Sequence, residues 1–341
     1  MLIHPRRDFL ALAGASLAAA TLPRASAASE PTPAPAAPVR TGNGDFVFET
    51  IPGWGTTPAG TPSGPTHGGI ARDKAGRIYA STDGPASILV YGTDGLFSHA
   101  IAKDFAGIHQ LQIVEENGEE FIYAAWLVGK RAVKLKLDGT LVWSIGAPVA
   151  GGATSADDWK PTAVVRGPDG TVYVCDGYGS SRIHVFGTDQ VWKKSFAGKG
   201  SADGQCRNCH GLSLDHRFGQ PLLLVMDREN RRLSHFDLEG KFVDHHSQHL
   251  RRPCQVSFHG EFAAVSEILG RVTILDKTGT PVAFAGDNPN RKQWDNYGVP
   301  RNDFREGLFF TPHGIHWEPG GDLLVSEWNK EGRISRLRLT V

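Results

Sequence analysis

Short apolar runs separated by turn-forming residues fill most of the chain, and one arrangement of them recurs six times. Each copy has a strand of small and apolar residues, a second strand that commonly ends in an acidic residue, and a third strand. The copies start at Gly68, His109, Thr162, His210, Cys254 and His313, which gives spacings of 41, 53, 48, 44 and 59 residues. Four-stranded propeller blades repeat at about this length. The pattern therefore predicts an all-β fold, a six-bladed β-propeller.

A fourth strand follows five of the copies, for example at residues 97–101 and 142–145, whereas the sixth copy reaches Val341 without one. Residues 46–51, upstream of the first copy, read Phe-Val-Phe-Glu-Thr-Ile and have no other place in the repeat. We expect this N-terminal strand to complete the sixth blade, which would close the ring and remove an exposed sheet edge. The propeller is then one domain, residues 44–341.

The N-terminus has the features of an export signal. Arg6 and Arg7 precede an apolar run over residues 10–22, and Ala25-Ser26-Ala27 offers a small-residue cleavage site. The paired arginines favour the twin-arginine route over an ordinary secretory signal for residues 1–27. Residues 28–43 are rich in Pro and Ala, which is typical of a disordered spacer. We expect a periplasmic or secreted protein with no membrane span, because the apolar run is too short.

Composition excludes some partners. Lys and Arg together number 36, as do Asp and Glu, so the chain has no net positive charge that would favour binding to nucleic acid. We expect a monomer that acts on a small molecule. Four cysteines in a chain of this length do not make a disulfide scaffold, and their pairing stays open.

The first strand of each propeller blade lines the central channel, so equivalent positions of the repeat converge there. Aligned in this way, His109, His210 and His313 fall in blades two, four and six, and small side chains fall between them. Alternate blades lie about 120° apart in a six-fold ring, and three neutral imidazoles with one open position are a ligand set for catalytic zinc. Iron, copper or nickel would also suit imidazole. His67, next to the ring, is a candidate for a further contact.

Two other motifs compete with this interpretation. His245-His246-x-x-His249 has metal-site composition but falls in a polar turn between blades. Cys206-x-x-Cys209-His210 matches the pattern of covalent haem attachment, although the start of a packed blade leaves little room for haem. A structural or disulfide role for these cysteines is the alternative.

The segments 174–183 (Val-Cys-Asp-Gly-Tyr-Gly-Ser-Ser-Arg-Ile) and 226–230 (Met-Asp-Arg-Glu-Asn), with those around His210 and His313, resemble peptidyl-hydroxyglycine amidating lyases of the NHL-repeat propeller group. The resemblance covers most of residues 67–340. It implies zinc on the three ring histidines, Tyr178 as the base that deprotonates a metal-bound substrate hydroxyl, and Arg228 as its assistant. Without that resemblance, both turns could simply cap their blades.

The sequence also departs from this family. Where the lyases carry a further active-site arginine, this chain has Asp83, and Gly314 and Thr311 replace an aspartate and a methionine of the family. Asp83 argues against a substrate with a free carboxylate. A metal-dependent lyase for a small hydroxylated substrate is the favoured function, without an organic cofactor. A non-catalytic NHL binding propeller and a propeller hydrolase or lactonase remain alternatives, although lactonase-type propellers usually bind calcium through carboxylates and Asn.

Overall fold

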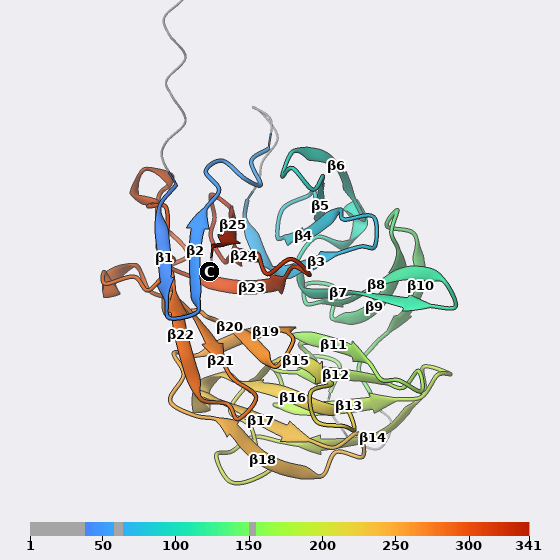
Figure 1. The fold of residues 1–341 in the computed structure, drawn as a ribbon. Coiled ribbons are helices and arrows are strands. Elements are labelled where there is room, and N and C mark those ends of the chain that lie inside the picture. The colour runs from blue at the N-terminus through green and yellow to red at the C-terminus, as the bar shows by residue number, and fades with distance from the viewer. Residues whose placement is uncertain (1–37, 58–63, 150–154, 341) are drawn as a thin grey trace, which may run out of the picture. The chain divides into compact units, whose positions relative to one another are not determined.

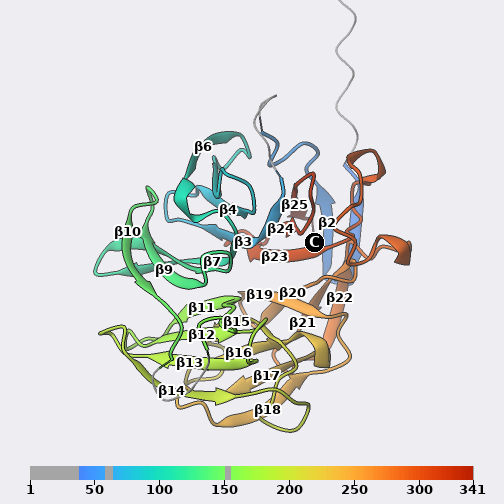
Figure 2. The ribbon, with the colours of Figure 1, turned by 180° about the vertical axis from the view of Figure 1, so that it is seen from behind.

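The computed structural model describes residues 38–57, 64–149 and 155–340, and these form a six-bladed β-propeller (Figures 1 and 2). Blade one contains β3 (Thr66–Arg72), β4 (Ile78–Thr82), β5 (Ile88–Tyr91) and β6 (Phe97–Ile101), and blade two contains β7 (Ile108–Glu116), β8 (Glu119–Trp126), β9 (Arg131–Lys136) and β10 (Leu141–Ile145). Blade three contains β11 (Ala163–Arg166), β12 (Val172–Asp176), β13 (Arg182–Phe186) and β14 (Trp192–Ala197), and blade four contains β15 (Cys209–Asp215), β16 (Leu222–Asp227), β17 (Arg232–Phe236) and β18 (Phe242–Ser247). Blade five contains β19 (Pro253–His259), β20 (Phe262–Glu267), β21 (Arg271–Leu275) and β22 (Pro281–Ala285). The predicted fold class is confirmed.

The sixth blade closes the ring as the sequence predicts. It contains β23 (Pro312–Trp317), β24 (Leu323–Glu327) and β25 (Arg333–Leu339), and β2 (Phe46–Thr50) pairs with β25 in antiparallel register. A fifth strand, β1 (Arg40–Asn43), pairs with β2. The predicted spacer over residues 28–43 is therefore too long, because its last four residues form β1. Thr41 and Asn43 also accept hydrogen bonds from the backbone of blade five. Residues 1–37, which include the predicted signal, lie outside the described residues.

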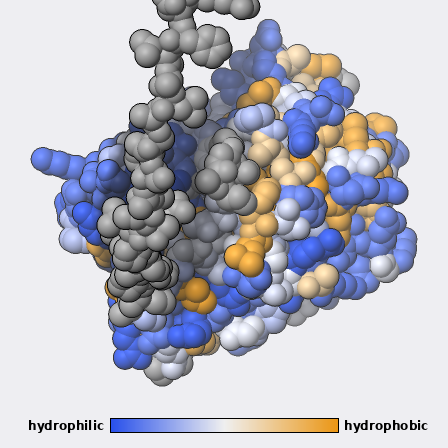
Figure 3. Space-filling view, turned by 90° about the horizontal axis from the view of Figure 1, so that it is seen from above, coloured by the Kyte–Doolittle hydropathy of each residue, from blue (hydrophilic) through white to orange (hydrophobic). Residues whose placement is uncertain are grey.

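The innermost strands β3, β7, β11, β15, β19 and β23 contact one another in sequence around the channel, and β23 returns to β3. A separate apolar core fills each interface between neighbouring blades, because one face of each sheet meets the next. Figure 3 shows one flank, where hydrophilic side chains predominate and apolar ones form narrow bands. This packing fixes the inner strands, and so the residues that face the channel.

Within residues 38–57, 64–149 and 155–340, helical structure is confined to single turns: η1 (Lys103–Phe105), η3 (Arg228–Asn230), η4 (Arg291–Gln293) and η5 (Arg301–Asp303). Among the described residues, no helix has the length and apolar character needed to cross a membrane. The turn η3 directly follows β16 and carries Arg228 to one mouth of the channel.

Candidate functional site

Each ring histidine is the extra residue of a β-bulge. The pairing of β7 with β8 skips His109, that of β15 with β16 skips His210, and that of β23 with β24 skips His313. A bulge leaves one residue out of the ladder and re-aims its side chain. These three side chains therefore leave the alternation of the strand and converge, with ring centroids 4.6 to 5.0 Å apart.

Backbone carbonyls of neighbouring blades orient two of the imidazoles. His109 Nδ1 lies 2.7 Å from the carbonyl oxygen of Thr162, and His210 Nδ1 lies 3.3 Å from that of Cys254. A carbonyl accepts only, so each Nδ1 carries the hydrogen and each Nε2 presents a lone pair to the site. His313 Nδ1, also buried, has no protein partner among the described residues.

Tyr178 reaches the same point from the loop between β12 and β13. Its hydroxyl oxygen lies 3.1 Å from His109 Nε2 and 3.0 Å from His210 Nε2. Arg228 donates to the same oxygen at 3.3 Å, and its guanidinium carbon lies 5.4 Å from the tyrosine ring centroid. The structure therefore brings together all five residues predicted from the sequence, His313 included.

The turn that carries Tyr178 also caps its blade, as the simpler interpretation expects. The buried Asp176 carboxylate accepts hydrogen bonds from the backbone N–H groups of Lys160 and Ser180, and Asp227 accepts one from that of Arg207. Gly177 has no room for a side chain, because a Cβ would lie 2.6 Å from the carbonyl oxygen of Cys209. The turn after β12 therefore both caps its blade through Asp176 and projects Tyr178 into the site.

His67 is a fourth imidazole at the site. Its ring centroid lies 4.6 Å from that of His109 and 5.1 Å from that of His313. His67 Nδ1 lies 2.6 Å from an Asp83 carboxylate oxygen, an arrangement that orients metal-ligating histidines in many proteins. The pairing of β3 with β4 is interrupted between Thr66 and Ile70, which gives His67 the freedom to turn inward.

Potential metal ligands at the site fall into two groups whose donor atoms lie within 4.8 Å of one another. One is His67, His109 and His313, and the other is His210, Cys254 and His313. His313 belongs to both, and the Tyr178 hydroxyl lies between His109 and His210. These donors are nitrogen and sulfur atoms, which favour zinc or another transition metal over calcium or magnesium.

Burial sets the protonation of the site. It holds the pKa of His109, His210 and His313 well below the usual value, and the neighbouring imidazoles and Arg228 add to the effect. The histidines are therefore neutral, which is the form that binds metals. Burial also raises the pKa of Tyr178, and Arg228 opposes that change without cancelling it. Burial thus keeps the phenol protonated in the chain by itself. A bound metal would add a second positive charge beside Arg228, and the two together would lower the pKa of Tyr178.

A cavity of about 420 Å³ opens above the cluster. Tyr178, Arg228 and His313 line it, whereas His109 and His210 are buried behind the tyrosine hydroxyl. The rest of its wall comprises His67, Asp83, Leu127, Val128, Ile268, Asp295 and Trp328. Most of these wall residues come from loops and strand ends outside the ring positions, so the repeat alignment gave no signal for them.

Neither competing motif forms a ligand site from its own residues, although His246 lies with Asp215 and His235 in a separate group of potential metal ligands. Cys206 and Cys209 are fully buried free thiols in the core between blades three and four, so they offer no place for haem attachment. His245 bonds Ser234 and Asp203, whereas His246 faces Arg217. Consecutive residues of β18 point to opposite faces of the sheet, so these two imidazoles cannot share an ion.

Comparisons with known proteins agree with this fold. The NHL repeat family matches residues 159–186, in the third blade. Streptogramin B lyase has 15% identity and a TM-score of 0.57, covering 88% of this chain and 98% of that one. A catalytically inactive histidine-to-alanine virginiamycin B lyase from Staphylococcus aureus, bound to quinupristin, has 14% identity and a TM-score of 0.56, covering 87% and 100%.

A gluconolactonase from Xanthomonas campestris has 13% identity and a TM-score of 0.59, covering 93% of this chain and 99% of that one. Identities this low show a shared propeller fold alone. These neighbours are lyases and a lactonase, and none of the three is an amidating lyase. The protein is therefore a six-bladed β-propeller with an NHL repeat.

Proposed function

We propose that this propeller is a metal-dependent lyase that cleaves a C–N or C–O bond of a small hydroxylated substrate in the cavity above the histidines. One observation carries the proposal: the Tyr178 hydroxyl lies within 3.1 Å of two neutral imidazole nitrogens and accepts a hydrogen bond from Arg228. A candidate base, a cation and metal ligands thus meet at the floor of one cavity. The export expected from residues 1–27 would make the enzyme periplasmic or secreted.

The chemistry of the donor set fits a metal. With both Nδ1 atoms protonated, His109 and His210 each direct a lone pair at Tyr178, whose hydroxyl has a single hydrogen to donate. One buried imidazole nitrogen is then left without a donor, which is costly unless a cation takes its lone pair. His109, His210 and His313, whose ring centroids lie 4.6 to 5.0 Å apart, would hold the ion. His67, which is oriented by Asp83 and forms one group of potential ligands with His109 and His313, could join them. When bound, a divalent ion would supply Lewis acidity and a second positive charge beside Tyr178.

Tyr178 and Arg228 would perform the proton transfer. With the ion bound, Tyr178 would be a phenolate whose own proton has passed to solvent. The phenolate accepts the proton of the substrate hydroxyl, the oxygen electron pair forms a carbonyl, and the bond to the leaving nitrogen or oxygen breaks. The phenol then returns that proton to the leaving group, so the reaction has no net proton change. Arg228, fixed by Glu229 at 3.1 Å, stabilises the negative charge that develops on oxygen.

The cavity wall favours an uncharged substrate. Leu127, Val128, Ile268 and Trp328 make its apolar part, and two carboxylates, Asp83 and Asp295, face the same space. Arg228 also lines the cavity but is paired with Glu229, and Asp295 is paired with Arg252, so a substrate carboxylate would meet Asp83 and Asp295 without a free counter-charge from the chain. The proposed substrate class is therefore a neutral α-hydroxyamide or a similar carbinol, rather than the acid that the amidating-lyase resemblance alone implies.

The experiment compares an N-acyl-α-hydroxyglycine with its neutral amide, using zinc-loaded protein and detection of the released aldehyde. We expect turnover of the neutral amide to be faster, and kcat to fall about 100-fold or more in Tyr178→Phe while bound zinc is retained. Unchanged kcat in Tyr178→Phe would remove the tyrosine from the mechanism. Opening of a lactone without cleavage of either amide would assign the site to hydrolysis instead.

A further inference from the structure

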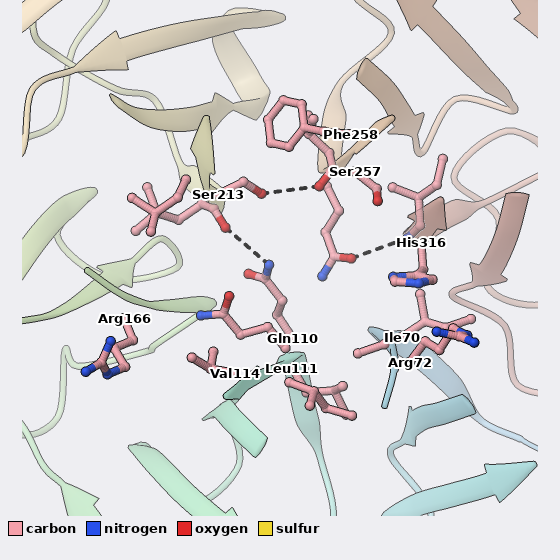
Figure 4. Close-up of a pocket in the computed structure, with 18 of the residues that line it drawn as sticks. Ile70, Arg72, Gln110, Leu111, Val114, Arg166, Ser213, Ser257, Phe258 and His316 are labelled. Atoms are coloured by element: carbon pink, nitrogen blue, oxygen red, sulfur yellow. Dashed lines mark hydrogen bonds between the residues drawn. The ribbon is translucent and has the colours of Figure 1, made fainter. Parts of the chain in front are cut away.

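A second cavity, here called the channel pocket, lies farther along the inner strands than the histidines. Its volume is about 440 Å³. On β7, β15, β19 and β23 its lining residues follow the ring positions, so it occupies a different part of the channel from the histidines. Figure 4 shows the side chains that line it, among them Gln110, Ser213 and His316. This volume is within the range of small-molecule sites.

The polar side chains of the channel pocket join neighbouring inner strands. Gln110 Nε2 donates to the carbonyl of Leu212 at 3.4 Å, and the Gln255 side-chain oxygen accepts from the backbone N–H of Ile315 at 3.3 Å. Ser213 donates to the carbonyl of Val256 at 3.2 Å (Figure 4). These contacts use one end of each glutamine amide and hold it in place.

The other end of each amide is left without a partner. Gln110 is 7% exposed and its Oε1 has no hydrogen-bond donor, while Gln255 is 4% exposed and its Nε2 has no acceptor, among the residues that the structure describes. Buried polar atoms are nearly always paired with protein, water or ligand. The two glutamines thus present one fixed acceptor and one fixed donor to the pocket. The buried Nε of Arg72, which also lines it, is a further donor without a hydrogen-bond partner among the described residues.

Charges around the channel pocket are already neutralised. Arg72 pairs with Glu318 at 3.3 Å and Arg166 lies 3.6 Å from Glu116. Burial, with Arg72 nearby, lowers the pKa of His316 to about 4, so its imidazole is neutral near pH 7. An ionic ligand would gain no free counter-charge from these groups.

The remaining wall is apolar and includes Ile70, Leu111, Val256, Phe258 and Ile315. A hydroxyl group both donates and accepts, so hydroxyls can satisfy Gln110 Oε1 and Gln255 Nε2 together. The C–H faces of a sugar ring suit aliphatic side chains and Phe258. We propose that the channel pocket binds a small uncharged polyhydroxylated ligand of monosaccharide size, independently of the histidine site.

The test uses the full mature chain and D-glucose, with glucose 6-phosphate and glucosamine as charged probes, in saturation-transfer NMR and calorimetry. We expect glucose to bind and both charged probes to bind at least about tenfold more weakly. Gln110→Met and Gln255→Met, which keep the side-chain volume, should each weaken glucose binding about tenfold. Gln248→Met, at an exposed glutamine, and Tyr178→Phe, in the other cavity, should leave it unchanged.

Glucose-soaked crystals of the unsubstituted protein provide a result that does not depend on the folding of variants. Sugar density that bonds Gln110 Oε1 and Gln255 Nε2 would support the proposal. Water alone at both atoms in such crystals, equal binding of the charged probes, or tight binding by both methionine variants would overturn it.

Discussion

Gly68 sets the position of His313, and the change Gly68→Ala measures how much this matters. A Cβ at Gly68 would lie 2.8 Å from His313 Cε1 and from the backbone oxygen of His109, and closer still to His313 Nδ1. Ordinary contacts begin at 3.4 Å, so these atoms would have to retreat by roughly 0.6 Å or more. The oxygen belongs to an inner strand and cannot move freely, so the imidazole must be displaced.

We expect two measurable effects of Gly68→Ala. Overpacking of this kind costs about 1–3 kcal/mol of unfolding free energy, and displacement of one ligand should weaken metal binding about 10–100-fold. Urea denaturation measures the first and competition with a chromophoric chelator the second. Gly320→Ala is the matched control, because a Cβ there meets no atom within 4 Å. If Gly68→Ala binds metal as tightly as the unsubstituted protein, His313 is not a ligand held by this contact.

Three further predictions follow from other contacts. Glu327→Gln, which removes the buried negative charge that pairs with Arg333, should lower the unfolding free energy by about 3 kcal/mol. Glu49→Gln, the control in a more exposed pair with Arg338, should lower it by less than about 1 kcal/mol. Equal losses of unfolding free energy in urea denaturation of the two variants would refute this prediction. Burial lowers the pKa of His246 to about 4, below its unfolded value of 6.5, so stability should fall as pH drops from 6.5 to 4. His246→Asn should reduce that fall by about 2 kcal/mol, and an unchanged pH profile would contradict the prediction. Asp83→Asn should weaken metal binding about tenfold through His67, and Asp94→Asn, at an exposed turn, should not.

The repeat made the blades and the ring predictable from sequence. Its period located each inner strand to within two residues, and the leftover segment at residues 46–51 identified the closing strand. The alignment also predicted that His109, His210 and His313 converge, and in the structure their ring centroids lie 4.6 to 5.0 Å apart. The strands and the ring positions could be predicted because the same local pattern of apolar and turn residues recurs in all six copies of the repeat.

Other parts of the site have no periodic signal. The bulges that re-aim the histidines depend on how two strands pair, and a single strand's sequence does not reveal this. The contact of His67 with Asp83 joins two different strand ends, and β1 is too short and polar to read as a strand. The resemblance supplied Tyr178 and Arg228, because a turn that caps a blade looks the same in sequence whether or not it also serves a site.

The proposed function requires a metal held by the histidine cluster, and elemental analysis of the purified protein tests this most directly. We predict about one transition-metal ion per chain, and less than about a tenth of that in His109→Ala, His210→Ala and His313→Ala variants that keep their strand content by circular dichroism. Absence of stoichiometric metal after zinc loading, or full retention of metal in these variants, would contradict the account.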